Sequence, residues 1–110
     1  MTYKIVFNEV ILNQLQKLKE NAPIRIILTK MFNKIEETGL NAGKLLDVQL
    51  HLYELKNKHP PIRLYFKQIS QEEILLFEYE IKTSEKKQNQ TIAKIKHKII
   101  LFFKTLNLSW

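Results

Sequence analysis

The chain has 110 residues, of which 45% are hydrophobic and 26% charged, and this is the composition of one globular domain rather than a disordered chain. It contains no cysteine, which excludes disulfides and cysteine-ligated metal sites and fits a reducing compartment. The formal charge of +7 favours polyanionic or acidic partners, although a merely lysine-rich composition would give the same charge.

No segment has the length and hydropathy of a membrane span. The longest apolar run, Ile99–Phe103, is flanked by lysines and falls far short of the roughly 20 residues that cross a bilayer. The first ten residues lack the apolar core of a secretory signal. We therefore expect a cytoplasmic protein with no membrane partner.

The first part of the chain predicts a strand and then a helical hairpin. Residues Thr2–Phe7 alternate apolar and polar side chains, as a half-buried strand does. Asn8 is suited to cap a following helix, and Pro23 is suited to the first turn of a second helix that Gly39 ends. Apolar residues recur at helical spacing in both segments: Ile11, Leu15 and Leu18, then Ile24, Ile27, Leu28, Met31 and Ile35.

The segment from Leu40 to Asp47 is predicted to be a connection. Its GLNAGKL sequence only superficially resembles a phosphate-binding P-loop. The glycine spacing is one residue short, Leu45 stands where Ser or Thr is required, and a helix rather than a strand precedes it. Nucleotide binding is therefore excluded here.

The second part predicts three antiparallel strands and a final helix. The strands are Val48–Leu55, Ile62–Ile69 and Glu73–Lys82, joined by links too short for anything but a meander. The helix is predicted to begin near Asn89. Its apolar stripe consists of Ile92, Ile95, Ile99, Phe102 and Leu106.

The element order β-α-α-β-β-β-α predicts an α+β fold in a single domain spanning residues 1–110. An N-terminal helical hairpin and a C-terminal helix would pack on one side of a small, twisted, mainly antiparallel sheet. In the middle strand, alternate residues would face the helices, and the others would present charge and tyrosine to solvent. The solvent-facing set would be Arg63, Tyr65 and Lys67. On the last strand, Leu75, Phe77, Tyr79 and Ile81 would share a face.

Four short motifs occur in order along the chain. They are GKL at Gly43–Leu45, LYELK at Leu52–Lys56, IRLYF at Ile62–Phe66 and ILLFEYEIK at Ile74–Lys82. Together with the element order, they resemble the RelE/ParE toxin superfamily and, within it, the HigB-like, phage-derived branch. The resemblance covers nearly the whole chain.

The resemblance implies a toxin of a type II toxin–antitoxin module, held inactive by a cognate antitoxin protein. Most such toxins cut mRNA in the A site of the ribosome without a metal or other cofactor, whereas the ParE branch poisons DNA gyrase. The HigB-like pattern favours the ribosome-dependent endoribonuclease, with ribosome and mRNA as partners.

The resemblance also implies site residues. Arg63 matches the family's strand arginine, and its guanidinium can bind two phosphate oxygens at once. Lys56 stands where the family usually has arginine, so the positive charge is kept but the ability to bind two oxygens at once is lost. Lys82 matches the second lysine of a Lys-Lys pair whose first position is Ile81, and Tyr65 can stack on an RNA base.

Two points about this site stay open. Arg63 has an alternative role, as the partner of Glu54 or Glu80 across the strands. The last-strand histidine of the family is replaced by Phe77, and a free lysine is a poor base at neutral pH. The remaining candidates for acid–base chemistry are Glu54, Glu78, Glu80 and His51.

Further RNA contacts are expected from Lys67, Lys86, Lys87 and His51. Seven lysines and one acid lie between residues 82 and 104, which gives a basic helix face suited to RNA or to an acidic antitoxin segment. A solvated face and, for His51, a structural role are the plainer alternatives. Two other functions remain open: a toxin-fold binding protein without nuclease activity, and a basic nucleic-acid-binding domain unrelated to toxins.

Overall fold

The computed structural model describes residues 2–18, 22–81 and 84–106, with side chains for all of these except residues 22 and 102–106. The elements in chain order are β1 (Lys4–Phe7), α1 (Glu9–Gln16), α2 (Ala22–Thr38), the 3₁₀ turn η1 (Gly39–Ala42), β2 (Lys44–Asp47), β3 (Leu52–Asn57), β4 (Ile62–Gln68), β5 (Glu73–Ile81) and α3 (Glu85–Leu106). The predicted α+β fold is confirmed.

The helix ends follow the local signals in the sequence. The side chain of Asn8 accepts a hydrogen bond from the amide of Val10 at 2.9 Å and caps α1. Gly39 follows the last residue of α2 with a φ of 62°, a left-handed conformation that favours glycine. Helix α3 begins earlier than predicted, because Ser84 caps it by accepting from the amide of Lys87 at 3.1 Å.

Five strands form one sheet in the order β1-β5-β4-β3-β2. Strand β1 runs parallel to β5, and the other neighbours are antiparallel. The structure adds the short edge strand β2 in the segment that was predicted to be a connection. Its approach to β3 requires glycine at position 43, because a Cβ there would lie 2.5 Å from the backbone oxygen of Glu54.

A turn separates β2 from β3, so β3 begins at Leu52 rather than at Val48. The Asp47 carboxylate accepts from the amide of Leu50 at 3.0 Å, and His51 has a φ of 51°. His51 therefore lies in this turn. The sequence pattern had placed it in a strand, and that prediction is wrong.

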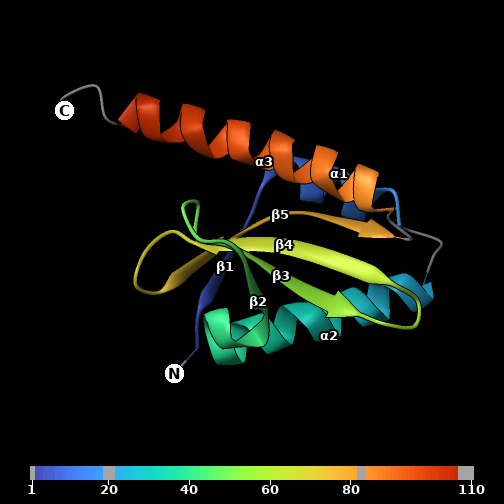
Figure 1. Ribbon diagram of the computed structural model, residues 1–110. Helices are drawn as coiled ribbons and strands as arrows, with labels where there is room; N and C mark the ends of the chain where they lie inside the picture. The colour runs from blue at the N-terminus through green and yellow to red at the C-terminus, as the bar shows by residue number, and fades with distance from the viewer. Residues whose placement is uncertain (1, 19–21, 82–83, 107–110) are drawn as a thin grey trace.

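Helices cover both faces of the sheet rather than one (Figure 1). Helices α1 and α2 pack on the face that carries Ile62, Leu64 and Phe66. Helix α3 packs on the opposite face through Ile95 and Ile99. The face predicted to be open to solvent is therefore covered by α3. In the described part of the chain, no helix has the length and hydropathy needed to cross a membrane.

A β-bulge alters which side chains of β5 face α3. Tyr65 of β4 lies opposite Glu78, but the next residue of β4, Phe66, lies opposite Leu76. Phe77 is the extra residue, and both Phe77 and Glu78 face α3, while Tyr79 faces the other core. The predicted alternation, which placed Phe77 and Tyr79 on one face, is wrong for this reason.

Candidate functional site

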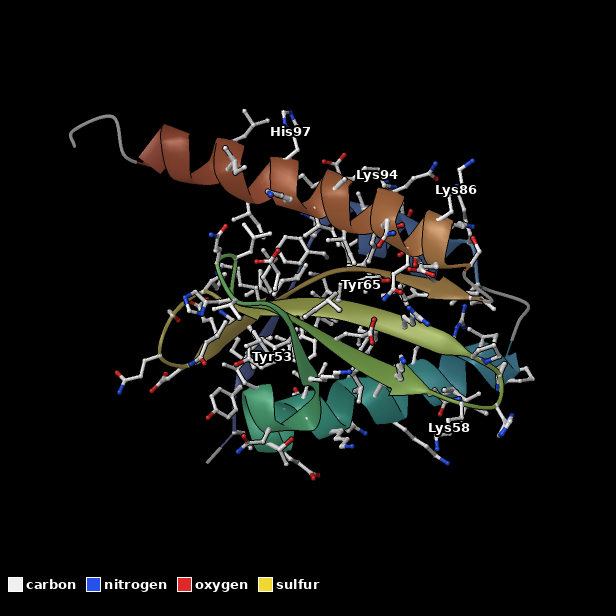
Figure 2. The ribbon with its side chains drawn as sticks, in the orientation of Figure 1. Tyr53, Lys58, Tyr65, Lys86, Lys94 and His97 are labelled. Carbon is white, nitrogen blue, oxygen red and sulfur yellow. The ribbon has the colours of Figure 1, made fainter. Side chains whose placement is uncertain are left out.

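The candidate site is the polar part of the sheet face beneath the N-terminal half of α3. The strand registers place six side chains in two adjacent rows across β3, β4 and β5. One row consists of Lys56, Arg63 and Glu80, and the next consists of Glu54, Tyr65 and Glu78. Figure 2 shows Tyr65 between the sheet and the helix. The pairing of β3 with β4 thus places Lys56 directly opposite Arg63.

Glu54 is the carboxylate between the two cations. Only 4% of this residue is exposed. Its Oε2 accepts a hydrogen bond from Nε2 of Gln88 at 2.6 Å and lies 3.8 Å from Nη1 of Arg63. Its Oε1 lies 3.9 Å from Nζ of Lys56. The predicted alternative for Arg63, a cross-strand ion pair with Glu54, is therefore present.

Glu80 and Tyr65 form a buried pair. The Tyr65 hydroxyl donates to Oε2 of Glu80 at 2.9 Å, and Oε1 of Glu80 is buried with no hydrogen-bond partner among the described residues. Burial raises the pKa of Glu80, and the charge of Glu78 raises it further, against the hydrogen bond from Tyr65 and the charge of Lys87. Burial, followed by the contact with Glu80, raises the pKa of Tyr65.

Helix α3 closes over these groups. Gln88 and the buried Thr91 face the sheet, and Nζ of Lys94 lies 3.6 Å from Oε1 of Glu78. Tyr65 is 0% exposed, so it cannot stack on a base while α3 is docked. The side chains of Arg63 and Lys56 are 25% and 55% exposed and reach solvent at the end of the sheet.

The other predicted lysines differ in their distance from this site. Lys86 and Lys87 are exposed in the first turn of α3, and Lys87 is near enough to Glu80 to act on its pKa. Lys86 points away from the sheet in Figure 2. Lys82, which the resemblance assigns to the catalytic set, lies outside the described residues.

Lys67 and His51 are grouped at the other end of the sheet. Lys67 is four residues beyond Arg63, about 13 Å along an extended strand. It is 9% exposed, its Nζ donates to the backbone oxygen of Leu50 at 2.5 Å, and burial lowers its pKa. His51 is exposed in the adjacent turn. The structure does not bring these two residues together with Arg63.

Sequence reasoning missed Gln88. An amide gives no charge signal, and the residue lies in a polar stretch of the chain. Its spacing was informative, however, because Gln88, Thr91, Ile95 and Ile99 recur at intervals of three and four and mark the buried face of α3. Among the described residues, no group of three histidines, cysteines or acids is placed to hold a metal ion.

Comparisons with known proteins identify the fold through solved structures. No protein-family model and no curated protein matches the chain. A mutant of the E. coli toxin RelE in the free state matches with a TM-score of 0.64 and 21% identity, over 86% of this chain and 99% of that one. The isolated E. coli RelE toxin matches with a TM-score of 0.61 and 20% identity, over 84% and 98%.

Toxin–antitoxin complexes are also similar. The RelBE2 complex from Mycobacterium tuberculosis contains a chain with a TM-score of 0.60 and 15% identity, matched over 74% of this chain and all of that one (100%). At these identities the likeness establishes the fold: this chain has the fold of the RelE toxins over nearly their whole length.

Proposed function

We propose that this protein is the toxin of a type II toxin–antitoxin module of the RelE/ParE superfamily, similar to its HigB-like branch. It would be a ribosome-dependent endoribonuclease that cuts mRNA, acts in the cytoplasm and is neutralised by a cognate antitoxin. The support is the RelE fold together with the four family-like motifs.

The observation that carries the nuclease proposal is the placement of Arg63 opposite Lys56. Two cations on neighbouring strands, both partly exposed at one end of the sheet, are suited to a single phosphate group. In the proposed reaction, the ribose 2′-oxygen attacks the adjacent phosphorus, and the bond to the 5′-oxygen breaks. Arg63 would hold the non-bridging phosphate oxygens, whose negative charge develops in the transition state, and Lys56 would lie beside them.

Replacement of Arg63 tests this proposal. In Arg63→Ala we expect cuts in a translated message to fall by about 10²–10³-fold, the usual effect of losing one group that stabilises transition-state charge. Induced expression followed by primer extension would measure the cuts. Arg25→Ala is the matched control, because Arg25 is the only other arginine and lies exposed on α2.

Three results are informative. Cuts at A-site codons that vanish in Arg63→Ala and persist in Arg25→Ala would support the nuclease. Equal cutting by both variants would show that Arg63 is not part of the catalytic site. Growth arrest without cuts in the wild type would sink the nuclease proposal itself.

A second candidate function is that of a binding protein with the toxin fold and no nuclease activity. Such a protein would poison gyrase, or would be a degenerate toxin that binds a partner. One observation favours it: three carboxylates and Tyr65 occupy the face where RNA would lie, each at most 7% exposed. Negative charge beneath the phosphate site opposes RNA binding. Growth arrest that survives Arg63→Ala would support this candidate.

A further inference from the structure

We propose that Glu54 is a positioning residue that holds Arg63 and Lys56 in place and couples both to helix α3 through Gln88. This inference rests on the proposed nuclease function for its consequence in catalysis. Its structural part, the ordering of Arg63, stands independently of that function.

The first argument is the burial of Glu54. A carboxylate that is 4% exposed has little access to water, so its charge must be balanced by protein groups. Two cations and one amide surround it, and they come from three different elements: Lys56 from β3, Arg63 from β4 and Gln88 from α3. Because Glu54 is fixed by the pairing of β3 with both β2 and β4, it is the rigid member of the group.

The second argument is the mobility that Arg63 and Lys56 would otherwise have. Both have long side chains that reach solvent, and each would lose side-chain entropy when it orders around a phosphate. An ion pair with a fixed carboxylate restricts that freedom in advance. Glu54 therefore lowers the ordering cost of the site at the moment of reaction.

The third argument separates positioning from proton transfer. Oε2 of Glu54 is already occupied by the short hydrogen bond from Gln88, and Oε1 faces Lys56. A general base needs an oxygen that can reach the substrate proton. Glu54 offers its oxygens to Gln88, Arg63 and Lys56 instead.

The fourth argument concerns α3. Gln88 is the group by which this helix contacts Glu54, and it shares Oε2 of Glu54 with Arg63. The position of α3 therefore decides how closely Arg63 is held. A change in the docking of α3 would therefore alter the position of the Arg63 guanidinium.

The test compares Glu54→Gln with Glu37→Gln, which removes the same charge from an exposed site on α2. In ribosomes programmed with a defined message, we expect the single-turnover cleavage rate of Glu54→Gln to fall at least tenfold. Its affinity for a short single-stranded RNA should be equal to or tighter than that of the wild type, because a nearby negative charge is gone. A merely structural defect would lower both the cleavage rate and the affinity for RNA. An unchanged cleavage rate would overturn the proposal.

A second readout does not depend on nuclease activity. The chain has only two arginines, so ¹⁵N spectra of the arginine Nε–H groups contain two side-chain signals, and Arg25→Lys assigns them. We expect the heteronuclear NOE of Arg63 to exceed that of Arg25 in the wild type and to fall to the Arg25 value in Glu54→Gln. An equally ordered Arg63 in that variant would overturn the proposal, even if the wild type cuts no mRNA.

Gln88→Leu keeps the proposal testable if Glu54→Gln does not fold. Its control is Gln90→Leu, the same replacement at an exposed position of α3. The Arg63 signal should shift in Gln88→Leu and stay in place in Gln90→Leu. The same spectrum in both variants would exclude coupling through Gln88.

Discussion

Glu80 is a buried acid with one carboxylate oxygen that no donor among the described residues reaches. It is 7% exposed, it receives one hydrogen bond from Tyr65, and its other oxygen has no hydrogen-bond partner in the described part of the chain. The charged groups around it are Glu78 on its own strand, Arg63 opposite it on β4, and Lys87 and Lys94 on α3. Burial is the largest influence on this carboxyl group and raises its pKa above the ordinary value.

This environment makes stability depend on pH with a definite sign. The pKa of Glu80 is raised above 4.5 in the folded chain, so the folded state binds this proton more tightly than the unfolded state. Stability contributed by Glu80 is therefore lost as pH rises from 4.5 through the folded pKa. We expect Glu80→Gln to gain free energy of unfolding relative to the wild type over that window, by about 1.4 kcal/mol for each unit of the pKa shift.

Urea denaturation at a series of pH values would measure this difference. Glu72→Gln is the control, because Glu72 is exposed and its removal changes the net charge equally. Parallel pH profiles for the wild type and Glu80→Gln would contradict the prediction.

At the level of the elements, α1 completes the edge of the sheet where β1 ends. Strand β1 pairs with β5 only as far as Leu76. Beyond it, the Gln14 side chain donates to the backbone oxygen of Tyr79 at 2.8 Å and accepts from its amide at 3.0 Å. One amide side chain thus takes the place of a neighbouring strand, and it holds the segment of β5 that carries Glu78 and Glu80.

Replacement of Gln14 should loosen this edge. In Gln14→Leu, both backbone groups of Tyr79 lose their partner, so we expect a loss of about 1–3 kcal/mol in the free energy of unfolding. Hydrogen exchange at the Tyr79 amide should accelerate as well. Gln16→Leu, at an exposed position of the same helix, should leave both unchanged. Equal effects of the two replacements would mean that the hydrogen bonds contribute little.

The features that were predictable from the sequence are those set by local chemistry. The cap at Asn8, the stop at Gly39 and the alternation along β4 depend on neighbouring residues. The placement of Lys56 opposite Arg63 depends in addition on the register of two strands. The bulge at Phe77 was not predictable, because it depends on the register with another strand. The sequence did not predict that α3 covers the second face of the sheet, because alternating polar residues in a strand usually face solvent. Only the tertiary structure shows that Gln88 and Lys94 of α3 contact the carboxylates of Glu54 and Glu78 on that face.

For the whole molecule, the distribution of charge is more uneven than the net value of +7 indicates. Glu54, Glu78 and Glu80 are among the eleven acids of the chain and are buried, whereas Lys86 and Lys87 are exposed at the start of α3. The exposed surface therefore carries a larger excess of positive charge than the net charge of the whole chain indicates. Helix α2, which also carries exposed lysines, lies on the opposite side of the sheet (Figure 1).

This asymmetry predicts where a polyanion binds. If single-stranded RNA contacts the N-terminal end of α3, each lost phosphate contact should reduce the slope of log affinity against log salt by about 0.7. The double variant Lys86→Ala, Lys87→Ala should then lower the slope by about 1.4, with both contacts removed. Fluorescence anisotropy of a labelled RNA over a range of salt concentrations would measure it.

The matched control is Lys30→Ala, Lys34→Ala, which removes the same charge from exposed positions on α2. A general, diffuse attraction of RNA to a basic protein would reduce the slope equally in the two double variants. A loss confined to the α3 variant would instead place the RNA at the first turn of α3, which adjoins the end of the sheet where β3 and β4 meet (Figure 1). The comparison thus separates a localised binding face from the consequence of composition alone.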